Sequence, residues 1–281
     1  MEIQSTTADS QKKKPNNWRT YLREPRQELL KLKAEKARRH LHEFVMQAWH
    51  VLEPDTLFID GIHVYAICEH LQAVTEGHIR HLIVNVPPGH AKSLLTAVFW
   101  PAWVWIDHPE ARWLFSSYRE PLATRDSVKC RRLIESEWYQ ERWGNRYQLA
   151  GDQNQKTRFE NTKTGCRVVV PMCAGTGERG DYVVVDDPHS VDQAESDLER
   201  KSALEWWNGS MATRLNDFAT GTKWSFSNGC MKATSAATCC RKAVTNCCVC
   251  PRSLSRSGGA RPRSAGRIPA KNVESCSGHK R

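Results

Sequence analysis

The sequence predicts a three-layer α/β fold, on the basis of three observations. An apolar run at residues 81–86 enters a Pro/Gly turn and continues as a helix-like pattern from Leu94. A second apolar run, at residues 182–185, ends in the adjacent carboxylates Asp186 and Asp187. Between these runs lie a further strand-like and a further helix-like pattern, and this alternation is typical of folds in which helices cover a sheet.

Residues 1–80, which precede the first predicted strand, divide into an arm and a helical lead-in. Residues 1–20 are polar and carry a lysine cluster, so we expect a disordered basic arm, either solvated or in weak contact with DNA or a partner. Residues 21–80 predict two helices, over about residues 24–51 and 63–75, because apolar residues recur there at near-helical spacing. The apolar positions of the first helix are Leu29, Leu30, Leu32, Ala37, Leu41, Phe44, Val45 and Trp49.

The turn after the first strand has residue types that suit the binding of nucleotide phosphates. Phosphates are bound by backbone N–H groups at a helix N-terminus, by a lysine, and through Mg²⁺ by a hydroxyl. Lys92 and Ser93 stand where the lysine and the hydroxyl are required. The usual pattern, G-x-x-x-x-G-K-S/T, has glycine where this chain has Val86 and Ala91, so a plain strand–turn–helix corner is the alternative interpretation. The predicted phosphate-binding residues are Pro88, Gly89, His90, Ala91, Lys92 and Ser93.

The two carboxylates after the second apolar run predict the other half of a nucleotide site. In open α/β sheets, ligands bind at the carboxyl ends of the strands, and a hard cation there prefers oxygen ligands. We expect Asp186, with the Ser93 hydroxyl, to hold Mg²⁺, and Asp187 to orient the attacking water. A solvated turn after a core strand is the alternative, but two matches in the correct order favour the nucleotide site.

Further elements are predicted between and after the two motifs. Residues 111–118 predict a strand and residues 122–134 a helix, an order found in additional-strand P-loop ATPases, which include motors and helicases. Residues 164–170 and 182–185 predict strands, and residues 193–212 a helix. We expect the spread tryptophans to be core residues rather than a base-stacking platform. They are Trp100, Trp103, Trp105, Trp113, Trp138 and Trp143.

Four segments of the chain share their residues with one known family. They read Pro87-Pro-Gly-His-Ala-Lys-Ser93, Phe115-Ser-Ser-Tyr-Arg-Glu-Pro-Leu-Ala-Thr-Arg-Asp-Ser127, Val183-Val-Val-Asp-Asp-Pro-His189 and Met211-Ala-Thr-Arg-Leu-Asn216. Together they resemble the ATPase domain of the terminase large subunit of tailed phages and prophages, over about residues 25–223. Ala91 departs from the family glycine, and the chain after Lys223 departs altogether.

The resemblance implies a function and partners for the chain. It implies a motor that couples ATP hydrolysis to packaging double-stranded DNA into a capsid, with ATP and Mg²⁺ as ligands. It implies a terminase small subunit, a portal protein and a homo-oligomeric ring as partners, in the cytoplasm of the host cell. It also places the adenine pocket against the helical lead-in, where Gln47 or His63 are the candidate contacts and core packing is the alternative, favoured role of the region.

The glycine-rich loop at residues 174–180 contains Arg179. One interpretation is a mobile turn. The other is that Arg179 reaches the γ-phosphate bound by a neighbouring subunit, as arginine fingers do.

The charge of the chain is unevenly distributed. Of 41 basic residues, 11 lie from residue 224 onward, and of 31 acidic residues only Glu274 does, which leaves 30 of each sign in residues 1–223. The net charge of +10 is therefore no argument for DNA binding by the body of the chain. No apolar run approaches the roughly 18 residues that span a bilayer, so we expect no membrane association.

The sequence changes character after Lys223. We expect residues 81–223 to form an incomplete ATPase core and residues 224–281 to be disordered, with no strand or helix period. Seven of the eleven cysteines lie in this tail, and its single acid, Glu274, cannot supply the metal ligands of a nuclease domain. An inactive remnant that at most binds nucleotide or partner subunits is therefore the alternative to an ATPase.

An out-of-frame translation would account for this change. If the reading frame is shifted to begin on the last base of codon 223, allowed codons give Val-Val-Ile-Gln-Gln-Arg-Leu-His-Glu-Gly-Asp-Leu-Ser-Gly-His-Leu-Leu from Trp224 onward. The Glu, from Met231 and Lys232, and the Leu from Cys239 and Cys240 are forced by the genetic code. This run resembles an apolar strand with a polar end, as the terminase family has after Thr-Gly-Thr-Lys.

Overall fold

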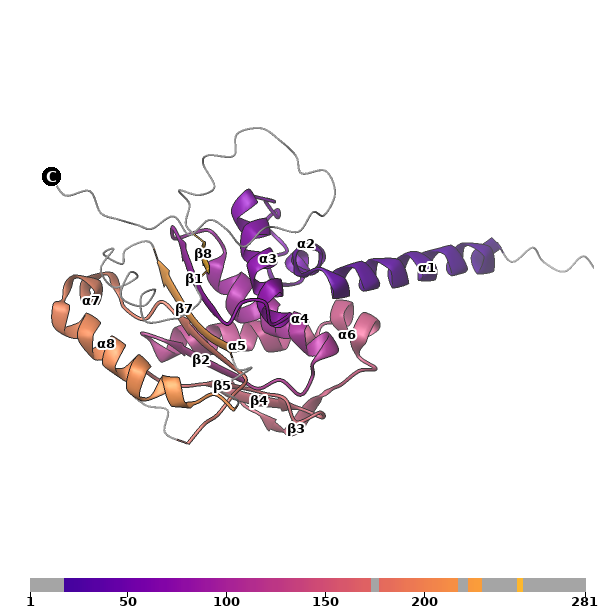
Figure 1. Cartoon of the computed structure of the whole chain (residues 1–281). Helices are drawn as coiled ribbons and strands as arrows, with labels where there is room; N and C mark the ends of the chain where they lie inside the picture. The colour runs from indigo at the N-terminus through magenta and orange to yellow at the C-terminus, as the bar shows by residue number, and fades with distance from the viewer. Residues whose placement is uncertain (1–17, 173–176, 217–221, 229–246, 250–281) are drawn as a thin grey trace, which may run out of the picture.

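The computed structural model describes residues 18–172, 177–216, 222–228 and 247–249, which form a mixed α/β fold (Figure 1). Within these residues one eight-stranded sheet has the order β3-β4-β5-β2-β6-β7-β1-β8. All pairs from β5 across to β8 are parallel, whereas β3, β4 and β5 pair antiparallel at one edge. The strands are β1 (His81–Val86), β2 (Trp113–Ser117), β3 (Leu149–Asn154), β4 (Arg158–Asn161), β5 (Cys166–Val169), β6 (Tyr182–Asp186), β7 (Thr222–Asn228) and β8 (Cys247–Val249).

Helices lie on both sides of this sheet. They are α1 (Trp18–Arg39), α2 (Leu41–Leu52), α3 (Ile62–Thr75), the π-helical segment η1 (Leu94–Phe99), α4 (Trp100–Asp107), α5 (Glu120–Glu135), α6 (Glu137–Trp143), α7 (Val191–Glu195), α8 (Asp197–Gly209) and the 3₁₀ turn η2 (Met211–Thr213). None of the helices in the described ranges combines the length and the apolar content needed to cross a bilayer. The predicted strands at 111–118, 164–170 and 182–185 and the predicted helix at 122–134 correspond to β2, β5, β6 and α5.

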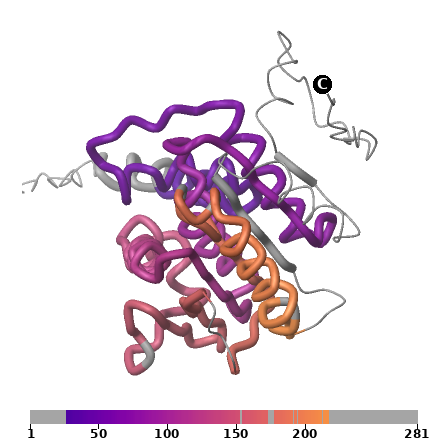
Figure 2. Tube along the Cα trace, turned by 90° about the vertical axis from the view of Figure 1, so that its left-hand side faces the viewer, coloured from indigo at the N-terminus to yellow at the C-terminus, as the bar shows by residue number. Residues whose placement is uncertain are grey.

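Alternating side chains of the central strands build two separate cores. Trp113 and Phe115 of β2 join a core with helices α1 to α6, whereas Leu114 between them joins a second core with α8. In β6, Val184 joins the larger core and Val183 joins the second core. Helix α8 lies across the opposite face of the sheet from the larger group of helices (Figure 2). The sheet is therefore the middle of three layers.

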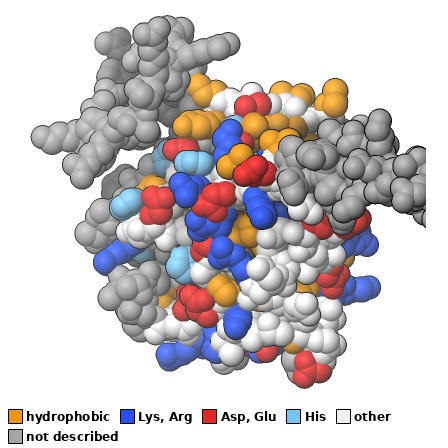
Figure 3. Space-filling model, turned by 90° about the vertical axis from the view of Figure 1, so that its right-hand side faces the viewer, with side chains coloured by type: hydrophobic (Ala, Val, Ile, Leu, Met, Phe, Trp, Pro, Cys, Tyr) orange, Lys and Arg blue, Asp and Glu red, His pale blue; other side chains and the backbone are white. Residues whose placement is uncertain are grey.

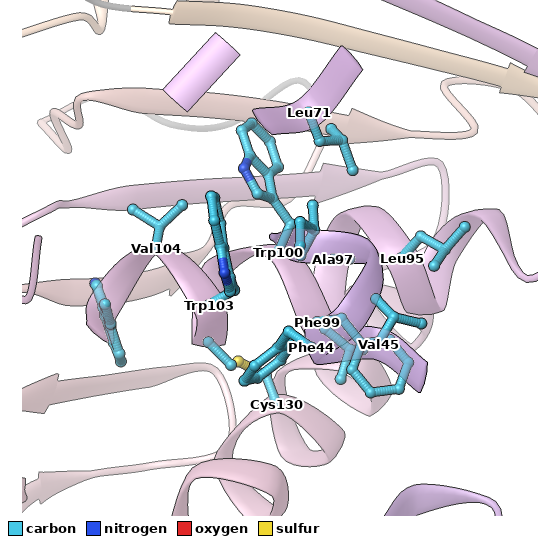
Figure 4. Close-up of a cluster of buried hydrophobic side chains, with 14 of the residues drawn as sticks. Phe44, Val45, Leu71, Leu95, Ala97, Phe99, Trp100, Trp103, Val104 and Cys130 are labelled. Atoms are coloured by element: carbon cyan, nitrogen blue, oxygen red, sulfur yellow. The ribbon is translucent and has the colours of Figure 1, made fainter. Parts of the chain in front are cut away.

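The larger core is rich in aromatic side chains (Figure 4). Phe44 of α2 makes edge contacts with Phe99 and Trp138, with ring centroids 6.4 and 5.6 Å apart. Trp100 packs edge-on against Trp113, with centroids 4.8 Å apart. The prediction that the tryptophans are core residues is confirmed, since five of the six are no more than 8% exposed and Trp138 is partly buried against the same cluster.

The lead-in differs from its prediction at His40. The expected helix over residues 24–51 is two helices, because His40 has an extended backbone (φ −131°, ψ 115°). The side chain of Gln72, from α3, spans this break: its Oε1 accepts from Leu41 N at 3.2 Å and its Nε2 donates to Arg39 O at 3.1 Å. The Gln72 side chain thus forms hydrogen bonds with backbone groups that lose their helical partners at the break. The local sequence around His40 does not predict this contact.

Two other predicted helical segments also differ in detail. Leu29, Leu30 and Leu32 are 37–65% exposed, so the apolar stripe of α1 is not covered at its start. The predicted helix at 193–212 is interrupted at Ser196, whose hydroxyl accepts from Glu199 N and so begins α8. Strands β3 and β4 had no counterpart in the sequence prediction. The expected arm lies outside the described residues except for residues 18–20, which belong to α1.

The helix after the phosphate loop passes through a π-helical stretch, for which Pro101 supplies a reason. Proline has no N–H to donate and its ring clashes with the carbonyl four residues earlier. Trp100 N donates instead to Leu95 O, five residues back, which widens the helix just before the proline.

The expectation of no strand after Lys223 is wrong for residues 224–228 and 247–249. Strand β7 pairs in parallel with both β1 and β6, and β8 pairs with β1. The side chains of residues 222–228 do not predict strand β7. A central strand is held by backbone hydrogen bonds from both neighbours, and these do not depend on its side chains. The rest of the predicted tail, residues 229–246 and 250–281, lies outside the described residues.

We predict that Gly165→Ala destabilises the fold. A Cβ at Gly165 would lie 1.9 Å from Pro109 O and 3.0 Å from Ala111 O, and backbone atoms cannot rotate away. The cost should be at least about 2 kcal/mol of unfolding free energy in a denaturant titration. Gly151→Ala is the matched control, because a Cβ there meets nothing within 4 Å. Equal stability of the two variants would contradict the packing around Gly165.

Candidate nucleotide site

The predicted phosphate loop leaves β1 and turns back into a helix through two residues with left-handed backbone. Gly89 has φ 83° and Ala91 has φ 55°. A Cβ at Gly89 would meet no atom within 4 Å, so the need for glycine there is conformational. The His90 ring nitrogen Nδ1 lies 3.0 Å from Pro87 O and closes the loop on itself. The helix then begins at Lys92, and Leu95 N donates to Ala91 O at 3.0 Å.

Lys92 joins this loop to the carboxyl end of β6. Its side chain is 5% exposed, and Nζ lies 3.0 Å from Asp186 Oδ1 and donates to Asp187 Oδ1. The two predicted motifs, 95 residues apart in the sequence, therefore meet in one buried ion pair. Two carboxylates face the one ammonium of Lys92, so the lysine does not neutralise both.

Asp187 is held in an unfavourable backbone conformation. It has φ 50°, which is uncommon for a residue other than glycine, although aspartate tolerates it better than most. Its carbonyl accepts from Tyr118 N at 3.0 Å, which extends the pairing of β2 and β6 one step beyond Ser117 and Asp186. The bend turns the Asp187 side chain toward Lys92.

Asp186 and Ser93 provide oxygen ligands suited to Mg²⁺. Asp186 Oδ1 is buried and accepts no hydrogen bond from the described part of the chain, despite its ion pair with Lys92. Ser93 is half-buried at the start of the helix. The described residues contain no group of three or more His, Cys, Asp or Glu side chains that could hold a metal ion alone. A divalent ion here would therefore need water or phosphate oxygens to complete its shell, as Mg²⁺ in nucleotide sites does.

Arg125 is a further basic residue near this end of the sheet, and the sequence analysis did not single it out. Strand β2 ends at Ser117, directly beside Asp186, and α5 begins three residues later at the same edge of the sheet. Arg125 Nε donates to Asp126 Oδ1 at 2.8 Å, and this hydrogen bond, with the nearby charge of Asp186, raises the pKa of Arg125. The sequence did contain a signal for this residue, because Arg125 is a basic residue in the second turn of the helix that follows β2.

The two candidate adenine contacts are separated by the structure. Gln47 Nε2 donates to Lys33 O at 3.1 Å and is occupied with holding α2 to α1. His63, at the start of α3, lies edge-on to His90 of the phosphate loop with ring centroids 4.9 Å apart. Burial, with a contribution from His90, lowers the pKa of His63, which favours a neutral ring there.

Arg179 lies at the opposite end of β6 from the acidic pair. It is exposed and precedes β6, whose five residues span about 16 Å. It cannot join Lys92 and Asp187 within one chain. Its predicted action on a neighbouring subunit stays a prediction.

On the face beside α1, the side chains of Lys and Arg in the described part of the chain lie interspersed with those of Asp and Glu (Figure 3). Hydrophobic side chains gather along one edge of the same view. Arg38 of α1 contacts Glu35 and Asp107 at 2.8 and 2.7 Å, and Arg146 contacts Asp107 at 2.8 Å.

No family model matches this sequence, and no curated protein matches it. Among solved structures, the chain is similar to the large terminase from a thermophilic bacteriophage, whose structure was determined in complex with ADP. The sequences are 10% identical, with a TM-score of 0.39. The likeness covers 67% of this chain and 47% of the terminase chain, so the matched part spans about half of that protein. The likeness is too distant to transfer any residue's role.

Proposed function

We propose that this chain is a Mg²⁺-dependent P-loop ATPase of the additional-strand type. The observation that carries the proposal is the buried contact of Lys92 with Asp186 and Asp187. A lysine at a phosphate loop and carboxylates at the end of a neighbouring strand are the two charged parts of such a site. A strand–turn–helix corner would leave the lysine exposed instead.

The strand order supports this proposal. Strand β7 lies between β1, which feeds the phosphate loop, and β6, which carries the carboxylates. The strands β2, β6, β7 and β1 all run parallel, so their carboxyl ends face the same edge of the sheet. Nucleotides bind at that edge in open α/β sheets.

The residues would act as follows. ATP draws Lys92 from the carboxylates to the β- and γ-phosphates, while loop N–H groups from Gly89 to Ser93 bind the remaining oxygens. Asp187, released from Lys92, accepts a hydrogen bond from the attacking water and holds it in line. Asp186 and Ser93 hold Mg²⁺, which when bound neutralises phosphate charge. Because Asp187 is one methylene shorter than glutamate, we expect slow turnover.

The assignment to a terminase large subunit rests on the resemblance of the four segments. On this proposal the ATPase drives double-stranded DNA into a capsid as part of a homo-oligomeric ring, with a terminase small subunit and a portal protein, in the host cytoplasm. Residues 224–281 would contribute no nuclease site to this motor, since they contain only one acid, Glu274.

An inactive prophage remnant is the second candidate, and β7 favours it. A central strand of a parallel sheet that is covered on both faces is typically apolar throughout. Residues 222–228 instead read Thr-Lys-Trp-Ser-Phe-Ser-Asn, with polar residues at alternate positions. The shifted frame would place Val-Val-Ile at residues 224–226. On this proposal, nucleotide binding survives while DNA translocation is lost.

We predict that Lys92→Ala lowers ATP affinity by at least about tenfold, because it removes a charged contact to the phosphates. Isothermal titration calorimetry with Mg·ATP on folded protein measures this. Ala91→Gly is the matched control in the same loop and should bind as well as wild type or better, because glycine adopts φ 55° without strain. Full affinity in Lys92→Ala would overturn the proposed function.

We predict different defects for the two aspartates. Asp187→Asn should keep Mg·ATP affinity and lose kcat, because its carboxylate acts on the water. Asp186→Asn should raise the Mg²⁺ concentration needed for half-maximal ATP binding, because it loses a metal ligand. Magnesium titrations of binding and of ATPase rate separate the two. Identical magnesium curves for both variants would refute this division of roles.

We predict that the gene carries a one-base change near codon 223. Restoring the frame should open a long coding sequence that begins Val-Val-Ile and continues into an acidic nuclease domain. Resequencing the gene and its downstream region checks this. The remnant proposal fails if neither alternative frame is open there, and the ATPase proposal is unaffected.

A further inference from the structure

The inference concerns Asp126 and rests on the proposed function. Asp126 lies on α5, is 3% exposed, and is close to two guanidinium groups. One belongs to Arg125, whose Nε donates to Asp126 Oδ1 at 2.8 Å. The other belongs to Arg167 of β5, whose charge also acts on Asp126.

Arg167 has an unusual environment for a charged side chain. It is 0% exposed, and none of its three side-chain nitrogens has a hydrogen-bond acceptor within the described ranges. Its guanidinium carbon lies 3.6 Å from the centre of the Phe115 ring, a cation–π contact. Burial lowers the pKa of Arg167, and the charges of Cys130 and Asp126 partly offset that effect. Burial likewise raises the pKa of Asp126, and the charges of Arg125 and Arg167 oppose that rise.

Arg125 differs from Arg167 in its exposure. Its side chain is 54% exposed, and the described hydrogen bonds engage only its Nε. Its two terminal amino groups are therefore open to another acceptor. Helix α5 begins three residues after β2 ends opposite Asp186, so Arg125, in the second turn of α5, lies on the helix that starts at the edge of the sheet proposed for the phosphates. An arginine fixed at Nε presents its remaining donors in a geometry that suits a phosphate.

We propose that Arg125 contacts the terminal phosphate of ATP bound to its own chain, and that Asp126, supported by Arg167, is the positioning residue that holds it there. Asp126 fixes one edge of the Arg125 guanidinium and leaves the other edge for the phosphate. The pair would make the site distinguish ATP from ADP, because only ATP carries the group that Arg125 reaches.

The test compares two ligands, Mg·ADP and a non-hydrolysable Mg·ATP analogue, by titration calorimetry on the full chain. Arg125→Ala should weaken binding of the ATP analogue by about ten- to hundredfold and leave ADP affinity unchanged. Arg132→Ala is the matched control: it removes the same charge from an exposed position on the same helix and should change neither affinity.

The double variant tests the positioning role. Asp126→Asn should weaken only the ATP analogue, and adding it to Arg125→Ala should cause no further loss, because Asp126 acts through Arg125. A purely structural role would lower both affinities and would add to the Arg125→Ala effect. Arg125→Ala does not depend on a buried residue, so it remains informative if Asp126→Asn fails to fold.

Lys92→Ala separates this inference from the proposed function. If Lys92→Ala leaves both affinities unchanged, the nucleotide site itself is wrong. If Lys92→Ala lowers both affinities but Arg125→Ala keeps the wild-type preference for the ATP analogue, the nucleotide site stands and the role of Arg125 and Asp126 is refuted.

Discussion

The structure depends on one buried electrostatic contact, that of Lys92 with Asp186 and Asp187. A lysine that is 5% exposed is costly to bury unless it is paired, and each carboxylate would be costly without the lysine. The contact requires β1 and β6 to end at the same edge of the sheet, with β7 between them. On the proposed function, phosphates would offer the lysine an equivalent negative partner, so the contact that stabilises the free protein would also prepare the site for a nucleotide.

Backbone strain lies at both ends of this contact. Ala91, directly before Lys92, and Asp187 both have positive φ, which costs of order 1–3 kcal/mol for each residue other than glycine. Such conformations persist where the surroundings hold them, and here the parallel pairing of β2 with β6 and the first turn of the helix do so. The chain therefore bends directly before Lys92 and at Asp187, the two residues whose side chains meet in the contact.

The sequence predicted those parts of the candidate site that consist of residues adjacent in the chain. The phosphate loop and the Asp186–Asp187 pair each follow an apolar run, so their type and order could be read directly. The break at His40 could not be predicted from the sequence, because the Gln72 side chain that stabilises it lies in another helix. Strand β7 could not be predicted either, since backbone pairing rather than a side-chain pattern defines it.

The proposed contribution of α5 to the site also could not be predicted from the local sequence. The proposed role of Arg125 depends on the pairing of β2 with β6, in a register that places Ser117 beside Asp186. The burial of Arg167 against Phe115 comes from the pairing of β5 with β2. These are consequences of strand order, which a single sequence does not specify.

On the proposed function, Lys92 exchanges its carboxylate partners for nucleotide phosphates when ATP binds. A crystal structure of the chain with Mg²⁺ and a non-hydrolysable ATP analogue would show this exchange. We expect Lys92 Nζ within about 3 Å of β- or γ-phosphate oxygens and no longer bonded to Asp187. A nucleotide bound elsewhere, or bound at the loop with the contact between Lys92 and Asp187 intact, would contradict it.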